Sequence, residues 1–419
     1  MTPRDAARAI FDSALAAGDV TPLVRRHLGL DSGRRRVLVL GCGKASAAMA
    51  AAAEQALGAR IAGGFVVVKD GCAVLVPRVE IAEAGHPVPD ARGLAASARL
   101  LELARGAGKD DLVLFLVSGG GSALTPAPAP PITLAEKQEI TRLLLASGAT
   151  IGELNAVRKH LSRFKGGQLA RAASPAGLLT LALSDVIGDP LDVIASGPTA
   201  PDPTTFADAR DVLARRGLAG CVPASVAARL EAGLRGDIEE TPKPGDRLFD
   251  RVTNVVIGNN ALIADAAVAA ASRLGYRPHL VTRELQGEAR EVARELVAHA
   301  RGLEPPACLI AAGETTVTVK GKGRGGRCQE FALAASLELV PADHMTVLAA
   351  GTDGNDGPTD AAGAIVDAES VARGTRAGGD ARRATEDNDA YRFLTASGDL
   401  IVSGPTRTNL LDLYLVLRS

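Results

Sequence analysis

The chain has 419 residues, of which 47% are hydrophobic and 23% are charged, and its formal net charge is −1. Domains usually hold ~100–200 residues, so this length predicts two globular domains with cores of ordinary composition. Because the chain has no basic excess and only 3% aromatic residues to stack on bases, nucleic-acid and anionic-membrane partners are not expected.

The first half of the chain alternates strand and helix patterns. Thr2 and Pro3 are typical of a helix start. The apolar runs 37–40 and 65–68, with the Ala-rich stretch 45–57 between them, predict a strand–helix–strand unit and hence a parallel sheet covered by helices. The later elements are predicted as helix 94–103, strand 112–117, a helix after the Thr133–Glu136 capping box, strand 178–183 and a long loop over 188–205.

The segment 241–246 (Thr-Pro-Lys-Pro-Gly-Asp) reads as a linker, which predicts a boundary between domains 1–240 and 250–419. A second series of α/β elements follows it, so the fold class is α/β with two domains. Helices are predicted at 259–274, 288–300 and 329–339, and strands at 255–257, 278–281, 309–312, 316–320 and 346–350. The segment 410–417 is a strand or a short helix, and packing of residues 390–419 back on the first domain stays open.

Two glycine-rich turns follow strands of the first half. Gly41–Ser46 opens a helix and carries Lys44, a cation that could hold a transferring phosphoryl group. It is not a P-loop, since Leu38 stands where that motif needs Gly, and Ser46 breaks the dinucleotide fingerprint. A surface lysine on a tight turn is the alternative. The second turn, Ser118, Gly119, Gly120, Gly121 and Ser122, predicts a backbone nest for anions or else a flexible connection.

Charged residues cluster further along the first half. Arg158 and Lys159 belong to a cationic run, 155–167, that either binds a carboxylate or phosphate or forms a solvated helix face. Asp185 follows a strand and Asp189 lies in the next loop. Such carboxylates can hold Mg²⁺ or accept a hydroxyl proton, although Asp before Pro, as at Asp189, is also ordinary turn chemistry.

The second half of the chain also has glycine-rich turns that carry charged residues. Gly313-Glu314 precedes the loop that carries Gly323, Gly325 and Arg327 and leads into a helix, as an anion-binding turn does. The neighbouring Cys328 has no evident partner, which favours packing. Asp353, in the loop 351–360, superficially suggests a calcium loop, but Ala364 stands at the twelfth position, so a Mg²⁺–nucleotide or substrate loop fits better.

These clusters together are typical of phosphoryl transfer, which needs cations on the moving group, Mg²⁺ on the phosphates and a positioned hydroxyl. Ligands of doubly wound sheets lie outside the carboxyl ends of the strands. Because such clusters follow strands in both halves, the sequence predicts one shared cleft between the domains. No nucleophile with an adjacent base and no zinc spacing is present.

With these residues in view, the chain resembles the type II glycerate kinases, the glycerate 2-kinase family with a MOFRL-type C-terminal half. The resemblance covers nearly the whole chain in order. The matching segments are GCGKAS (41–46), AGHPVPD (84–90), SGGGSAL (118–124), NAVRKHLSRFKGGQLA (155–170), LSDVIGDPLDVIASGPTAPDPT (183–204), GNNALIADAA (258–267), GETTVTVKGKGRGGRCQEFALA (313–334), GTDGNDGPTDAAGAIVD (351–367) and SGPTRTN (403–409).

The resemblance implies phosphoryl transfer from ATP, with Mg²⁺, to the C2 hydroxyl of D-glycerate. It implies a Rossmann-like N-terminal domain, a MOFRL-type α/β C-terminal domain and a site between them, with Lys44 and Arg327 essential. We further expect Asp185 and Asp189 in catalysis, Asp189 and Asp353 at the metal, and Arg158 or Lys159 on the substrate. The remaining nucleotide contacts are expected from Ser118, Gly119, Gly120, Gly121, Ser122, Gly313, Glu314, Gly323, Gly325 and Asp353.

The chain departs from the family pattern at Cys328, Ala312 and Arg407, where the family has Asn, Gly and Gly. These departures bear on affinity more than on reaction type. The alternatives are an NAD(P)H-dependent hydroxypyruvate reductase, another label of the family, and a non-catalytic binding regulator.

The five cysteines form no CxxC pair, and the sequence has neither an apolar leader nor a membrane-length apolar run. We therefore expect a cytoplasmic protein, and homodimer formation stays open.

Overall fold

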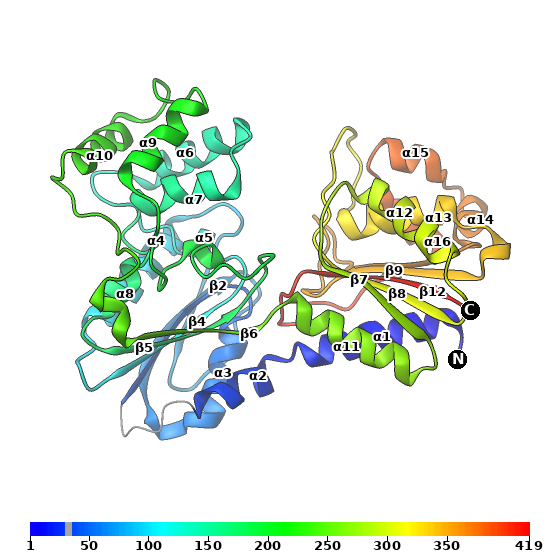
Figure 1. The fold of residues 1–419 in the computed structure, drawn as a ribbon, viewed down its shortest axis with the longest axis horizontal. Helices are drawn as coiled ribbons and strands as arrows, with labels where there is room; N and C mark the ends of the chain where they lie inside the picture. The colour runs from blue at the N-terminus through cyan, green and yellow to red at the C-terminus, as the bar shows by residue number, and fades with distance from the viewer. Residues whose placement is uncertain (30–35) are drawn as a thin grey trace. The chain divides into compact units, whose positions relative to one another are not determined.

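The structure is a computed structural model that describes residues 1–29 and 36–419. It divides into two compact units, each built on a six-stranded sheet: the first unit is Val20–Ile257, and the second is Met1–Asp19 with Gly258–Ser419 (Figure 1). The sequence placed the boundary at 241–246 and residues 1–19 in the first domain. The observed boundary lies later because strand 252–258 adds to the first sheet.

The helix α1 (Pro3–Ala17) belongs to the second unit. Thr2 caps this helix as predicted and forms a capping box with Asp5, and the apolar face of the helix buries Ile10 and Phe11. It lies alongside α11 (Asn260–Arg273). Helical periodicity identified this helix correctly but could not reveal which domain its apolar face covers.

The first sheet has the strand order β3-β2-β1-β4-β5-β6. The pairings from β3 through β5 are parallel. The fully buried strands β4 and β5 are unbroken apolar or small-residue runs, as expected for a sheet covered on both faces. The strands are β1 (Val37–Cys42), β2 (Ile61–Lys69), β3 (Glu80–Ala84), β4 (Leu112–Val117), β5 (Gly177–Leu183) and β6 (Val252–Gly258).

Helices cover this sheet and form a further layer with its own apolar core. α4 and α8 pack into the core on one side of the sheet, α2 and α3 lie on the other, and α6, α7, α9 and α10 pack together beyond (Figure 1). The helices are α2 (Val20–Leu28), α3 (Ser46–Leu57), α4 (Ala91–Arg105), α5 (Gly121–Leu124), α6 (Leu134–Ala146), α7 (Ile151–His160), α8 (Gln168–Ala173), α9 (Phe206–Arg215) and α10 (Ala224–Leu234), with 3₁₀ turns at Gly58–Arg60, Ile194–Ser196 and Arg247–Arg251.

The second sheet has the order β11-β10-β9-β12-β8-β7, and it is mixed. β12 is antiparallel to both β8 and β9, whereas β7 and β8 are parallel. The end of the chain is thus a central strand of the second unit; packing of residues 390–419 on the first domain stays a prediction. The strands are β7 (Arg277–Leu285), β8 (Ala307–Gly313), β9 (Met345–Gly351), β10 (Gly363–Asp367), β11 (Leu400–Ile401) and β12 (Asp412–Arg418).

Helices lie on both faces of the second sheet, with α1 and α11 on one face and α12, α13 and α16 packed into the core on the other (Figure 1). The predicted strand 316–320 is wrong. The Glu288 carboxylate and the Asn388 side chain accept from backbone N–H groups there, in place of a strand partner. The remaining elements are α12 (Ala289–Arg301), α13 (Arg327–Glu338), α14 (Ser370–Arg376), α15 (Ala381–Glu386), α16 (Ala390–Ser397) and a 3₁₀ turn at Pro341–Asp343.

Within the described ranges, no helix combines the length and the apolar composition needed to span a bilayer.

Candidate active site

The order of strands in the first sheet reverses between β1 and β4, which is where doubly wound sheets bind ligands. The two predicted glycine turns follow these two strands and pack on each other. The N–H of Lys44 donates to the Gly119 carbonyl at 2.9 Å. Gly43 has φ +132°, and a Cβ there would lie 2.3 Å from the Ser118 Oγ. The close approach of the two turns therefore requires glycine at this position.

A cluster of buried cations surrounds the second turn. The Lys165 Nζ donates to the carbonyl and the Oγ of Ser122, at 2.7 and 3.0 Å. The Arg158 guanidinium donates to the same Oγ at 2.6 Å. Lys137, from the first turns of α6, is 3% exposed; the charge of Arg158 acts on it, and its own charge acts on Lys165. We call Lys137, Arg158 and Lys165 the cationic cluster.

The cationic cluster has no counter-ion among the described residues: none of its members forms an ion pair with a described carboxylate. Burial, with the charge of Arg158, lowers the pKa of Lys137 to about 7. Burial lowers the pKa of Arg158 to about 10, and burial with both neighbouring cations lowers that of Lys165 well below its usual value. Proteins normally pair buried charges, so this arrangement indicates a place for an anionic ligand.

Unused hydrogen-bond donors mark the same place. The Lys137 Nζ, the Arg158 Nε and the Asn155 Nδ2 are buried and have no hydrogen-bond partner. Each of the three is a donor, and buried donors are seldom left unpaired. A ligand rich in acceptor oxygens, such as a carboxylate or a phosphate, would satisfy them.

Strained backbone lies against the cluster. The non-glycine residues Ala195 and Ser196 have φ of +50° and +62°. The Ser196 Oγ bonds the Asn155 Oδ1 and the Ser122 Oγ, both at 2.9 Å. Such conformations cost ~1–3 kcal/mol each and concentrate at functional sites. The strain therefore supports a functional reading of this network.

Of the two predicted substrate-binding residues, the structure favours Arg158. Lys159 is 2% exposed, and its Nζ pairs with Asp192 at 3.0 Å and with buried Asp202 at 3.3 Å. These carboxylates neutralise the lysine and anchor it in the fold. The adjacent Arg158 instead faces the turn that carries Ser122.

The predicted carboxylates lie on the loop after β5, which neighbours β4. Asp185 is half-buried two residues past the end of the strand. Asp189 has φ +54°, and its N–H donates to the Val186 carbonyl at 3.1 Å, so it serves the turn as well. Both carboxylates thus follow the same edge of the sheet as the two glycine turns.

In the second unit, three strand ends meet at one edge of the sheet, where Asp412 lies in register between Gly313 and Gly351. Arg327, the first residue of α13, donates two hydrogen bonds to Asp412, at 2.5 and 2.9 Å, and pairs with Glu314 at 2.7 Å. Burial alone would lower the pKa of this guanidinium, but the bonds to Asp412 and that carboxylate's charge raise it. The predicted residues Gly313, Glu314 and Arg327 therefore do come together, around an aspartate that the sequence did not single out.

The start of α13 is capped by a buried aspartate. Asp356 accepts from the N–H groups of Cys328 and Gln329, at 3.2 and 2.8 Å. Burial raises the pKa of Asp356 to about 7 despite these donors. Burial also raises the pKa of the Cys328 thiol well above its usual value, which fits packing and not nucleophilic chemistry.

The loop before α13 uses its glycines for close packing. A Cβ at Gly323 would lie 2.4 Å from the Asp389 Cβ, and one at Gly325 would touch Ala390. Asp353 holds its own turn, since its Oδ1 accepts from the Asn355 N–H at 3.0 Å. Close packing against Asp389 therefore explains why residue 323 is glycine, and a nucleotide contact is not needed to explain it.

The described residues contain no group of three or more His, Cys, Asp or Glu side chains arranged to hold a metal ion. Mg²⁺ usually binds one or two carboxylates and completes its shell with water and substrate phosphates. A lone carboxylate such as Asp189 in the first unit or Asp353 in the second matches that mode, in which the nucleotide brings the ion, and each is considered within its own unit.

Comparison with known proteins adds to this geometry. Residues 6–231 match the model of a domain of unknown function, DUF4147, and residues 307–412 match that of the MOFRL family. A D-glycerate 2-kinase of Thermotoga maritima is 43% identical, with 91% of this chain and 90% of that protein covered. The crystal structure of a glycerate kinase from Thermotoga maritima superposes with a TM-score of 0.90 at 40% identity, covering 99% of each chain.

The chain belongs to the MOFRL-type glycerate 2-kinase family. A further relative, from Agrobacterium vitis, is 44% identical over 100% of this chain and 95% of its own length, and it is named a putative hydroxypyruvate reductase. The recognition made from the sequence motifs is therefore confirmed, as are the two α/β domains. The predicted location of the site in a cleft shared by both domains stays a prediction, because the structure defines each unit by itself.

Several residues of the candidate site were missed from the sequence. Lys137 lies in a charged helix start that reads as solvated, and Lys165 was counted only as part of a cationic run. Asn155 was noted only as the first residue of that run, and Asp412 lay in no motif. The usable signal was the nearness of Lys165 to Gly166-Gly167, since glycine pairs allow close approach of a ligand or another chain segment.

Proposed function

We propose that this protein transfers the γ-phosphoryl group of ATP to the C2 hydroxyl of D-glycerate, giving 2-phosphoglycerate and ADP. The cationic cluster carries the proposal. Three buried cations, two of which carry an unpaired donor, lie with the unpaired amide of Asn155 beside the turn that follows β4, at the switch point of a Rossmann-like sheet. Glycerate offers a carboxylate for them, and family membership selects this substrate among small anionic ones.

The first unit supplies substrate binding. Lys137, Arg158 and Lys165 hold the glycerate carboxylate, with Ser122 and Ser196 fixing the cations and the strained turn. The nest residues 118–122 offer backbone N–H groups to an anionic oxygen. Lys44 lies in the first of the two glycine turns and stabilises negative charge on the transferring phosphoryl group.

The chemical step is an in-line displacement. The C2 oxygen forms a bond to the γ-phosphorus while the bond to the β–γ bridging oxygen breaks, and ADP leaves with that electron pair. The hydroxyl proton passes to a carboxylate on the loop after β5, for which Asp185 is the first choice and Asp189 the second. This division leaves Asp189 available to Mg²⁺.

The second unit supplies nucleotide contacts. Arg327, oriented by Asp412 and Glu314, faces the negative charge of the phosphates, and Gly313, Gly323 and Gly325 shape the loops beside it. Asp189 in the first unit, or Asp353 in the second, would hold Mg²⁺, which would supply positive charge to offset the charge of the nucleotide phosphates. We further expect a cytoplasmic location, and homodimer formation stays open.

The test is incubation of the purified chain with Mg-ATP and D-glycerate, with ADP quantified by chromatography. An NADH-coupled readout is avoided because it would itself register reductase activity. Glycerate-dependent ADP, absent with L-glycerate, is the expected result. If ADP does not form and NADH or NADPH is oxidised with hydroxypyruvate, the proposal fails and the reductase reading replaces it.

A further inference from the structure

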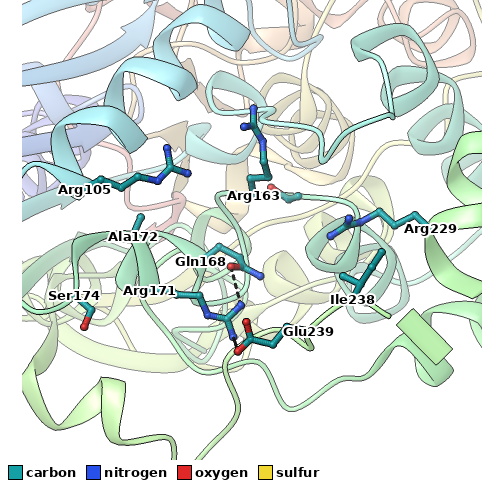
Figure 2. A pocket seen from close by; sticks show the side chains of 10 residues that line it. Arg105, Arg163, Gln168, Arg171, Ala172, Ser174, Arg229, Ile238 and Glu239 are labelled. Carbon is teal, nitrogen blue, oxygen red and sulfur yellow. Dashed lines mark hydrogen bonds and ion pairs between the residues drawn. The ribbon is translucent and has the colours of Figure 1, made fainter. Parts of the chain in front are cut away.

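The first unit contains a second concentration of positive charge. A surface pocket of about 490 Å³ opens where the end of α4, the loop before α8, α8 and α10 meet (Figure 2). None of the residues assigned above to the candidate active site lines it. The pocket therefore requires its own explanation.

Four arginines line this pocket: Arg105, Arg163, Arg171 and Arg229. The one acidic residue in the lining, Glu239, pairs with Arg171 at 3.1 Å and is mostly exposed. The lining thus carries a net charge of about three positive, in a chain whose overall charge is −1. Like charges held together repel one another, so an anion in the pocket would stabilise the arrangement.

Two of the arginines are held in place by the protein. Arg171 donates to the Glu240 carbonyl at 2.9 Å and to the Gln168 Oε1 at 3.2 Å. Arg229 donates through Nε to the His160 carbonyl at 2.7 Å, which orients its guanidinium at the pocket wall. Burial lowers the pKa of Arg229. These two side chains form a fixed side of the site.

The guanidinium N–H groups of the other two arginines are available to a ligand. Arg105 and Arg163 are exposed, and neither side chain has a hydrogen bond or ion pair with any residue that the structure describes. Figure 2 shows Arg105, Arg163 and Arg229 reaching from three separate segments around the space above Gln168 and Arg171. Each guanidinium is a rigid fork that fits a carboxylate or phosphate with two parallel bonds.

We propose that this arginine pocket binds a small ligand that carries at least two phosphate or carboxylate groups. A single anion would engage one or two of the guanidinium groups, whereas a cavity of this volume accommodates a ligand of metabolite size with separated charges. Ala172 and Ile238 add apolar surface for the body of such a ligand. This proposal does not depend on the reaction proposed above.

The experiment is calorimetric titration of the full chain with pyrophosphate and, separately, with citrate, in the absence of ATP and glycerate. The variants are Arg105→Gln/Arg163→Gln for the pocket, Lys137→Met for the cationic cluster, and Arg25→Gln as an exposed-arginine control from the same unit. We expect saturable binding of at least one probe, weakened about tenfold or more only in the double variant. The tighter probe identifies the phosphate or carboxylate class.

Four results would overturn the proposal: no binding of either probe, unchanged affinity in the double variant, an equal loss in Arg25→Gln, or a loss in Lys137→Met alone. The last would place the anion at the cationic cluster. Glycerate-dependent turnover of the double variant, measured separately, should equal that of the unsubstituted chain. Loss of the pocket is thereby distinguished from failure of the kinase assignment.

Discussion

Lys137→Met should stabilise the protein and at the same time weaken glycerate binding. Burial and Arg158 lower the pKa of Lys137 from 10.5 to about 7. A shift of that size corresponds to a cost of up to about 5 kcal/mol for holding the ammonium charged in the fold. Replacement of buried ion pairs by well-packed apolar side chains is often neutral or stabilising by ~1–4 kcal/mol, and we expect a gain within that range here because the surroundings of the buried charge relax.

The direction in which stability changes with pH follows from the same shift in the pKa of Lys137. Between pH 7 and 10.5 the folded chain binds fewer protons at Lys137 than the unfolded chain does, so the free energy of unfolding rises with pH across that window. The stabilising effect of Lys137→Met should therefore be present at pH 6 and fade toward pH 10.

Loss of one charge-assisted hydrogen bond to the carboxylate should raise the KM for glycerate ~10–100-fold.

Differential scanning calorimetry at pH 6 and pH 9.5, with KM measured at pH 7.5, tests both halves of this prediction. Lys109→Met, which removes an exposed lysine of the same unit, is the matched control and should change neither quantity. A destabilised Lys137→Met chain with unaltered KM would refute the reasoning. It would mean that the buried ammonium is satisfied by the fold and has no ligand.

Four other substitutions test separate parts of the account. Lys44→Ala should lower turnover ~10²-fold or more, measured as ADP release at saturating substrate, with the melting temperature nearly unchanged. Arg327→Lys should lower turnover by a similar factor, because lysine cannot make the two parallel bonds to the buried Asp412; near-normal rates would remove Arg327 from the mechanism. Lys159→Met should destabilise the chain by ~3–5 kcal/mol in calorimetry by leaving a buried carboxylate unpaired, and a stable variant with a raised KM would return this lysine to the substrate. The raised pKa of Asp356 means that the folded chain binds the extra proton between about pH 4 and 7, so stability falls as pH rises through that window; Asp356→Asn should flatten this fall in melting temperatures recorded from pH 4.5 to 7.5.

Local features of the fold were predictable because their causes are local. Strand 112–117 is an unbroken apolar run, and the helix after Thr133 begins with a capping box that the structure shows in full. Gly43 and the nest at 118–122 follow strands, and strand ends of a parallel sheet gather at one edge. These rules predict that both turns lie at the same edge of the sheet.

Other features were decided by tertiary packing and left no mark on the local sequence. Lys137 is buried because the helices α6 and α7 pack together, although its neighbours in sequence are charged. Lys159 and Arg158 are adjacent and chemically alike, and their roles differ because Asp192 and Asp202 lie against Lys159. The insertion of β12 between β8 and β9 requires pairing over long sequence distances, which periodicity does not report.

The most direct test of the central claim is proton-coupled ³¹P NMR of the full chain with Mg-ATP and D-glycerate. The account predicts that the γ-phosphate resonance of ATP decays while a phosphomonoester doublet grows, since a phosphate on C2 couples to a single proton. A triplet would place the phosphate on C3 and contradict the assigned geometry of the acceptor. Loss of the γ-phosphate to inorganic phosphate, with no ester signal, would contradict glycerate as the acceptor altogether.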